Sequence, residues 1–221
     1  MLNITIDGKA GCGKSTLADE LSKRLNIKKF NTGAVYRAIA CEYLKRYESK
    51  NPNEEIINEF VKNLDVKVVF DNNVQKVIVN DEDYTPFLRE ERISNFVAKV
   101  SPYDIVRQKV REIQREFAKS NDCIMEGRDI GSVVLTNAKI KLFITASNEV
   151  RAQRRVNQLK EQNVKVDYDE ILKEINDRDY QDVHREHGAL LPAKDAIIID
   201  NSNETLEQTI DRCLDIINSN K

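Results

Sequence analysis

Several residue types are scarce in this sequence. It has no tryptophan, and glycine and proline account for only seven and four of its 221 residues. These numbers exclude collagen-like and low-complexity chains. No apolar run approaches the roughly eighteen residues of a membrane-spanning helix, and the N-terminus lacks the basic segment and apolar run of a secretory signal.

Cysteine is also sparse, and its four positions are far apart: Cys12, Cys41, Cys123 and Cys213. None belongs to a Cys-x-x-Cys pair. We therefore expect reduced thiols in a cytoplasmic protein rather than a disulfide or zinc framework.

A basic excess is absent as well, since 35 Lys and Arg face 37 Asp and Glu, for a net charge of -2. This balance argues against a nucleic-acid partner but leaves room for a local basic pocket that binds a small polyanion. With 40% hydrophobic residues, the chain can bury the core of one compact domain with a small inserted lobe. We expect a monomer with no membrane partner.

Short β-branched runs alternate with longer helical patterns along most of the chain. Strands are predicted at 4–6, 27–30, 123–125, 140–145 and 197–199, and helices at 14–26, 34–46, 149–162 and 206–217. Strands that are separated by helices predict an α/β fold, a parallel sheet with helices on both faces.

The segment of about 64–86 breaks this alternation. Val66, Val68 and Phe70 alternate along one strand, Asp71-Asn72-Asn73 follows, and a second strand begins near Lys76. Asx-rich residues between two such runs predict a hairpin, so we expect a small antiparallel insertion. Two helices should follow it, at about 87–100 and 102–119.

Residues 8–15 read G-K-A-G-C-G-K-S, directly after a predicted strand and before a predicted helix. This is the P-loop pattern, in which backbone N–H groups and the helix N-terminus cradle a phosphate. Lys14 would bind the β- and γ-phosphates, and the Ser15 hydroxyl would bind Mg²⁺. A Rossmann loop fits less well, because Thr16 stands where the third glycine or alanine is needed. A switch GTPase would carry an N-K-x-D motif, which the sequence lacks, so a small metabolite kinase fits best.

A kinase with an anionic acceptor must neutralise charge between two polyanions, which makes arginines near sheet-edge loops informative. In the segment 31–37, Thr32 can cap a helix that carries Tyr36 and Arg37; the alternative is an ordinary cap with a surface arginine. In the segment 126–132, Arg128 and Asp129 favour a site loop; the alternative is a surface turn with a local Arg–Asp pair.

Two further arginine groups lie on predicted helices. Arg151, Arg154 and Arg155 share one face, which suits either a mobile lid over phosphates or a solvated basic face. Arg178, Asp182 and Arg185 also share a face. They could bind a phosphate and sugar hydroxyls, or pair with one another in solvent.

Taken together, these segments resemble the bacterial cytidylate kinases, which are nucleoside monophosphate kinases. The resemblance runs nearly end to end, through ITIDGKAGCGKST at 4–16, NTGAVYRAIA at 31–40, EGRDIGSVVL at 126–135, RDYQDVHRE at 178–186 and ALLPAKDAIIID at 189–200. Many families share the P-loop, but the combination of these motifs in this order is highly specific.

The resemblance implies a P-loop nucleotide-kinase fold in a single domain over 1–221. Its core would comprise about 1–30, 120–147 and 190–221. A monophosphate-binding region would cover about 31–119, with the β insertion at about 64–86, and a helical lid would cover about 148–188. The implied reaction transfers the γ-phosphate of ATP to CMP or dCMP in the presence of Mg²⁺.

The family's site residues map onto matching positions. ATP would be bound by Gly8, Lys9, Ala10, Gly11, Cys12, Gly13, Lys14, Ser15 and Thr16. The acceptor would be bound by Thr32, Tyr36, Arg37, Arg107, Arg128, Asp129, Arg178, Asp182 and Arg185. Among these, Arg37, Arg128 and Arg185 would hold the phosphate, Arg178 and Asp182 would serve the ribose, and Arg107 and Asp129 would read the cytosine. The catalytic set would be Lys14, Arg128, Arg154, Arg155 and Arg178.

The sequence departs from the family pattern in places. Glu126 replaces an aspartate, Ala98 replaces a serine that faces the base, and Asp104 replaces a proline. Two other functions remain open at this stage: a P-loop kinase for UMP, AMP or a shikimate-like acid, and a nucleotide-binding module without transfer activity.

Overall fold

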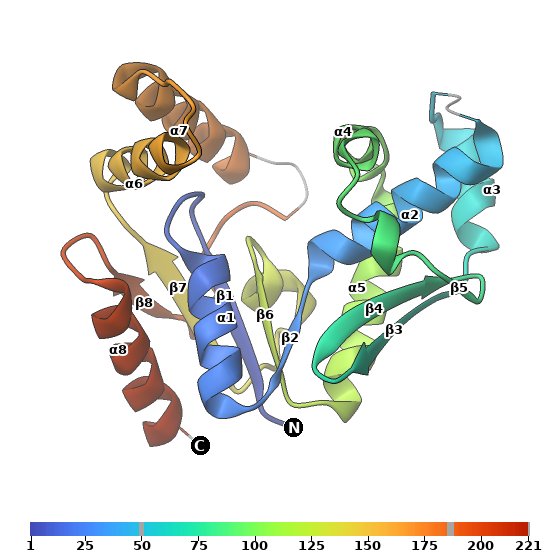
Figure 1. The fold of residues 1–221 in the computed structure, drawn as a ribbon. Coiled ribbons are helices and arrows are strands. Elements are labelled where there is room, and N and C mark those ends of the chain that lie inside the picture. The colour runs from blue at the N-terminus through green and yellow to red at the C-terminus, as the bar shows by residue number, and fades with distance from the viewer. Residues whose placement is uncertain (49–50, 185–187, 221) are drawn as a thin grey trace. The chain divides into compact units, whose positions relative to one another are not determined.

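The computed structural model describes residues 1–48, 51–184 and 188–220. The chain forms two compact units, one made of Met1–Lys29 with Asn121–Lys221 and the other of Phe30–Ser120 (Figure 1). None of the helices within the described ranges is long and apolar enough to cross a membrane.

The first unit is built on a five-stranded sheet with the order β2-β6-β1-β7-β8. Its strands are β1 (Asn3–Gly8), β2 (Lys28–Phe30), β6 (Cys123–Gly127), β7 (Ile140–Thr145) and β8 (Ile197–Asp200). The central strand β1 pairs in parallel with β6 and with β7, so that Ile4 lies between Ile124 and Ile140. The apolar runs of these strands explain why the sheet is buried, and the predicted parallel sheet is confirmed.

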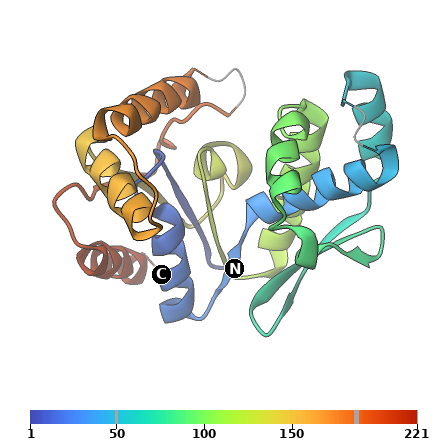
Figure 2. The same ribbon diagram turned by 45° about the horizontal axis from the view of Figure 1, so that its top comes forward.

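Within its described residues, this unit also contains the helices α1 (Lys14–Leu25), α6 (Asn148–Glu161), α7 (Tyr168–Val183) and α8 (Leu206–Ser219) and the π-helical turn η2 (Ile130–Val134). Leu17 and Leu21 of α1 and Ile210 of α8 join the core with the sheet. The helices α6 and α7 lie side by side and have a small apolar core of their own, formed by Ala152, Val156, Ile171 and Ile175 (Figures 1 and 2).

The second unit combines helices with a small antiparallel sheet. Its elements are α2 (Thr32–Tyr47), α3 (Glu54–Lys62), β3 (Val66–Asp71), β4 (Val74–Val79), β5 (Glu82–Asp83), η1 (Thr85–Phe87), α4 (Glu91–Val100) and α5 (Asp104–Ser120). Tyr43, Phe60 and Phe96 pack their rings together between α2, α3 and α4.

The structure confirms the antiparallel insertion and extends it. Asn72 and Asn73 adopt φ values of 49° and 63°, which is the left-handed turn that the Asx-rich segment predicts. Asn80 and Asp81 make a second turn of the same kind, so that the sheet gains the short third strand β5. The helix α3 was not predicted from the sequence. The helix expected from 87 begins only at Glu91, because a short 3-10 turn at Thr85–Phe87 precedes it.

Candidate active site

The phosphate loop connects β1 to α1, as the sequence predicted. β1 ends at Gly8, α1 begins at Lys14, and Gly13 caps the helix with a φ of 82°. Gly8 has a φ of 145°, and a Cβ atom there would approach Ile144 O to 2.0 Å, so that only glycine fits. The loop therefore has the strand–loop–helix geometry of a phosphate site.

Lys14 is buried at the end of this loop, with a relative exposure of 6%. Its Nζ donates a hydrogen bond of 2.6 Å to Lys9 O. Burial, followed by repulsion from Arg128, lowers the pKa of Lys14 from 10.5 to about 8. An ammonium that is poorly solvated in this way gains strongly from an incoming polyphosphate.

Ser15 and Glu126 place two oxygen ligands next to each other. Ser15 Oγ donates to Glu126 Oε1 at 2.7 Å. The parallel register between β1 and β6 explains this contact, because it pairs Ile6 with Glu126 and so brings the end of β6 beside the phosphate loop. Hydroxyl and carboxylate oxygens suit Mg²⁺, which keeps several waters and is completed by substrate phosphates. The residues therefore fit a nucleotide-bound Mg²⁺ ion.

Asp7 links the phosphate loop to the loop after β6. Its Oδ1 accepts from Ile130 N at 2.9 Å and its Oδ2 from Gly131 N at 2.6 Å, at the start of the π-helical turn η2. Burial outweighs these hydrogen bonds and raises the pKa of Asp7 from 3.8 to about 6. Through these contacts, Asp7 fixes the backbone that follows Arg128 and Asp129.

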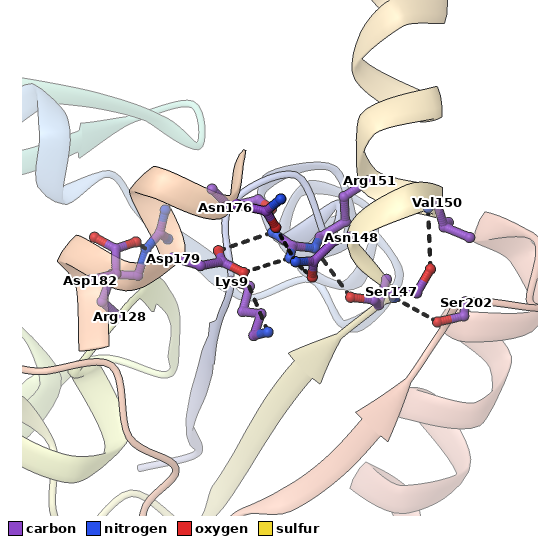
Figure 3. A network of polar contacts seen from close by, with 12 residues as sticks. Lys9, Arg128, Ser147, Asn148, Val150, Arg151, Asn176, Asp179, Asp182 and Ser202 are labelled. Atoms are coloured by element: carbon purple, nitrogen blue, oxygen red, sulfur yellow. Dashed lines mark hydrogen bonds and ion pairs between the residues drawn. The ribbon is translucent and has the colours of Figure 1, made fainter. Parts of the chain in front are cut away.

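Arg128 and the buried Asp182 form an ion pair. Arg128 Nε donates to Asp182 Oδ2 at 2.7 Å, and Asp182 is fully buried (Figure 3). For Arg128, the sequence left open a site loop or a local pair with Asp129. For Asp182, it left open a contact with sugar hydroxyls or pairing with Arg178 and Arg185. The structure pairs Arg128 with Asp182 of α7, which lies 54 positions further along the chain. Two residues with separately predicted roles thus belong to one cluster.

The arginines of α6 do not form one group. Arg151 is fully buried and pairs with Asp179, whereas Arg154 donates to Asn201 Oδ1 at 3.0 Å and to Asn201 O at 2.8 Å. Arg155 donates to Gln158 of its own helix. The interpretation of all three as a lid or as a solvated face is therefore wrong for Arg151. The catalytic roles of Arg154 and Arg155 remain predictions.

The second unit contains four of the predicted acceptor residues: Thr32, Tyr36, Arg37 and Arg107. Thr32 does not cap α2, contrary to our prediction. Asn31 is the cap and accepts from Ala34 N at 3.1 Å, while Thr32 Oγ1 accepts from Gln114 Nε2 at 2.9 Å. Asn31 takes this role because the helix begins at Thr32, two residues earlier than predicted. Arg107 lies on α5 and donates through Nε to Ser101 O, in the connection between α4 and α5.

Of the other predicted acceptor residues, Arg178 belongs to α7. Arg178 is exposed on this helix, one residue before the buried Asp179. Arg185 lies outside the described residues.

Sequence reasoning did not assign a role to three charged residues near the phosphate loop: Asp7, Glu126 and Asp179. Asp7 carried a usable signal, because it is the one charged residue in the apolar run Ile4–Asp7 that enters the loop. Asp179 carried none, because its partners Arg151 and Lys9 are far from it in the sequence.

A P-loop at the carboxyl end of the central strand of a parallel sheet defines the class of P-loop nucleotide-binding proteins. Comparison with known proteins gives the family. The cytidylate kinase family model matches residues 4–219. The chain belongs to the cytidylate kinase family.

Individual relatives agree with this assignment. The chain is 41% identical to a cytidylate kinase of Caldicellulosiruptor saccharolyticus over 215 residues, which cover 97% of this chain and 95% of that protein. It is also 41% identical to a cytidylate kinase of Clostridium botulinum over 220 residues, covering 98% and 99% of the two chains. A solved structure of an uncharacterised protein from Eubacterium ventriosum is similar with a TM-score of 0.53 at 16% identity, over 99% and 98% of the chains. This last similarity concerns the fold alone.

Proposed function

We propose that this protein transfers the γ-phosphate of ATP to CMP or dCMP. The observation that carries the proposal is a complete P-loop with a buried Lys14, in a chain of the cytidylate kinase family. The substrates would be small molecules, and Mg²⁺ would accompany ATP.

The residues of the phosphate loop and the residues next to it each have a specific task in this reaction. The backbone from Gly8 to Thr16 binds the phosphates of ATP, and Lys14 Nζ leaves Lys9 O to follow the charge of the γ-phosphoryl group. Ser15 and Glu126 would hold the nucleotide-bound Mg²⁺, which supplies charge neutralisation on the phosphate oxygens.

The acceptor side depends on the loop after β6. Asp182 accepts a hydrogen bond from Arg128 Nε and so fixes the guanidinium. One of the two outer nitrogens, Nη1, donates to Gly127 O. A preset guanidinium of this kind can bind the acceptor phosphate without further ordering. Asp129 and Arg107 would recognise the base, with Arg37 and Arg185 on the phosphate and Arg178 on the ribose.

A substrate panel tests this proposal. Purified protein is given ATP, Mg²⁺ and one of CMP, dCMP, UMP, AMP or shikimate, and ADP release is followed by a coupled assay. We expect the highest kcat/KM with CMP or dCMP. Best turnover with AMP or shikimate would contradict the proposal, and ATP binding without transfer to any acceptor would indicate a nucleotide-binding module instead.

A further inference from the structure

Arg151 is unusual because its whole side chain is buried, with 0% exposed. A buried guanidinium is costly unless its N–H groups all find acceptors. Here five hydrogen bonds leave it. Nε donates to Ala146 O at 3.1 Å, Nη1 to Ala10 O at 2.9 Å and to Asp179 Oδ1 at 3.0 Å, and Nη2 to Asn148 Oδ1 at 2.5 Å and to Asp179 Oδ2 at 2.6 Å. The five donors of the side chain are matched by five acceptor contacts.

Asp179 is the partner that makes this burial tolerable. Its two oxygens accept from both outer nitrogens of Arg151 in the bidentate geometry, and Oδ2 also lies 3.3 Å from Lys9 Nζ (Figure 3). One carboxylate from α7 therefore balances two cations, one on α6 and one in the phosphate loop. These three segments are joined at a single point.

The contact with Ala10 O bears directly on the loop. A peptide unit is planar and trans, so its C=O and the following N–H point in opposite directions. When Arg151 holds the carbonyl of Ala10, it turns the N–H of Gly11 to the other side of the loop. The stem of Arg151 also packs against the same peptide, since a Cβ atom on Gly11 would lie 3.3 Å from Arg151 Cβ.

We infer that Arg151 and Asp179 are positioning residues that preset the phosphate loop for ATP. They act through the Ala10–Gly11 peptide, and neither contacts the reacting atoms. The pair also connects the loop to the α6–α7 hairpin, so that a shift of these two helices alters the orientation of the N–H groups of the loop. This inference rests on the proposed function, because it takes the loop's ligand to be ATP.

The test uses three variants of the full-length protein. Asp179→Asn keeps the shape but removes the charge, and Arg151→Lys keeps the charge but loses the bidentate contact. Arg24→Lys is the matched control, because Arg24 also pairs with carboxylates, those of Glu207 and Asp211 on α8, away from the loop. We expect the KM and the dissociation constant for ATP to rise about tenfold or more in the first two variants, with the KM for CMP within about twofold of wild type.

Hydrogen exchange separates positioning from mere stabilisation. In Asp179→Asn, the amides of residues 11–14 should exchange faster while those of the β1 core remain protected under conditions where the variant stays folded. If both KM values rise equally, or if neither the ATP affinity nor the loop amides change, the inference is wrong. If the wild-type protein binds ATP but does not phosphorylate CMP, the proposed function fails, while ATP affinity and exchange still test the positioning role.

Discussion

At the scale of single residues, Lys14 is the side chain on which the proposed reaction depends most. It is buried, and among the described residues its ammonium donates to a backbone carbonyl of the loop, Lys9 O. Charge that develops on the phosphoryl group can therefore attract Lys14 more strongly in the transition state than in the ground state.

Replacing Lys14 should therefore affect turnover more than acceptor binding. For Lys14→Ala, we expect kcat to fall about 100-fold or more, with the KM for CMP changed only a few-fold. Steady-state kinetics with varied CMP at saturating ATP measures this split, and circular dichroism checks that the variant is folded. An unchanged kcat would remove Lys14 from the catalytic set.

The lowered pKa of Lys14 predicts proton uptake on ATP binding. Near pH 8.5 a large fraction of Lys14 is neutral, because its pKa is about 8 without nucleotide. Bound phosphates favour the charged form, so binding draws in a proton and ATP affinity falls as pH rises above 8, by at most about tenfold per pH unit. Calorimetry at pH 8.5 in buffers of different ionisation enthalpy measures the uptake. Lys14→Arg stays protonated and should show none; equal enthalpies for the wild type would contradict the prediction.

Asp129 is the residue that we expect to choose cytosine over uracil. A carboxylate accepts from the exocyclic amine of cytosine but would face the O4 lone pairs of uracil, a mismatch of about 1–3 kcal/mol. Asp129→Asn, whose amide can donate to O4, should lower the CMP-to-UMP ratio of kcat/KM by about 10- to 100-fold. If Asp129 only orients its neighbour Arg128, both substrates weaken equally and the ratio stays unchanged.

At the scale of elements, the π-helical turn η2 depends on close packing against β1. A Cβ atom on Gly131 would lie 2.7 Å from Thr5 Oγ1 and 3.3 Å from Asp7 Oδ2. Thr5 and Asp7 are both buried in the strand, so neither can move aside easily. The turn can therefore approach the strand only with glycine at this position.

Gly131→Ala should consequently destabilise the protein by about 1–3 kcal/mol. Gly33→Ala is the matched control. Its added methyl group would meet the flexible end of Arg37 at 3.0 Å and Asn31 Oδ1 at the ordinary contact distance of 3.4 Å, at a helical position where alanine is favoured. Urea denaturation measures both free energies of unfolding. An equal loss of stability in the two variants would show that crowding against β1 does not cause the destabilisation.

At the scale of the whole molecule, the alternating strands and helices were predictable because each carries a strong local pattern. The same holds for the hairpin at Asn72-Asn73, where the turn residues themselves require a left-handed backbone. The helix α3 was missed, although its N-cap Asn53 and its buried Ile57 and Phe60 fit a helix, because the segment lies among polar residues. Local sequence patterns are sufficient to predict an element where the backbone preferences of its own residues determine its structure.

The candidate site was predictable only in part, for a related reason. The phosphate loop is contiguous in sequence, so one motif contains it. The ion pairs Arg128–Asp182 and Arg151–Asp179 join residues that are 54 and 28 positions apart, and only the packing of α7 on the rest of its unit brings them together. Helical spacing groups residues of one helix, and it could not indicate these partners on other elements.

The stability of the molecule should depend on pH through Asp7. Its pKa is about 6 in the folded protein, above the ordinary value of 3.8. Between these values the folded state binds more protons than the unfolded state, so the free energy of unfolding decreases as pH rises from about 4 to 6. Over two pH units, the contribution of Asp7 amounts to at most about 3 kcal/mol. At neutral pH, the ionised Asp7 therefore lowers the free energy of unfolding.

Asp7→Asn removes this titration while keeping the size of the side chain. The variant loses one of the two side-chain oxygens that accept from the backbone N–H groups of Ile130 and Gly131, so it should be less stable than wild type at pH 4.5, but the difference should shrink by about 1–3 kcal/mol by pH 7. Urea denaturation at several pH values measures it. Asp200→Asn is the control, because hydrogen bonds from Ser202 lower the pKa of the exposed Asp200 below its ordinary value of 3.8. Asp200 is therefore ionised in both the folded and the unfolded state above about pH 4, and its difference in stability from wild type should stay constant from pH 4.5 to 7. A stability difference between wild type and Asp7→Asn that is constant from pH 4.5 to 7 would show that Asp7 does not titrate in this range, and its buried carboxylate would then be held ionised by the two amides of η2.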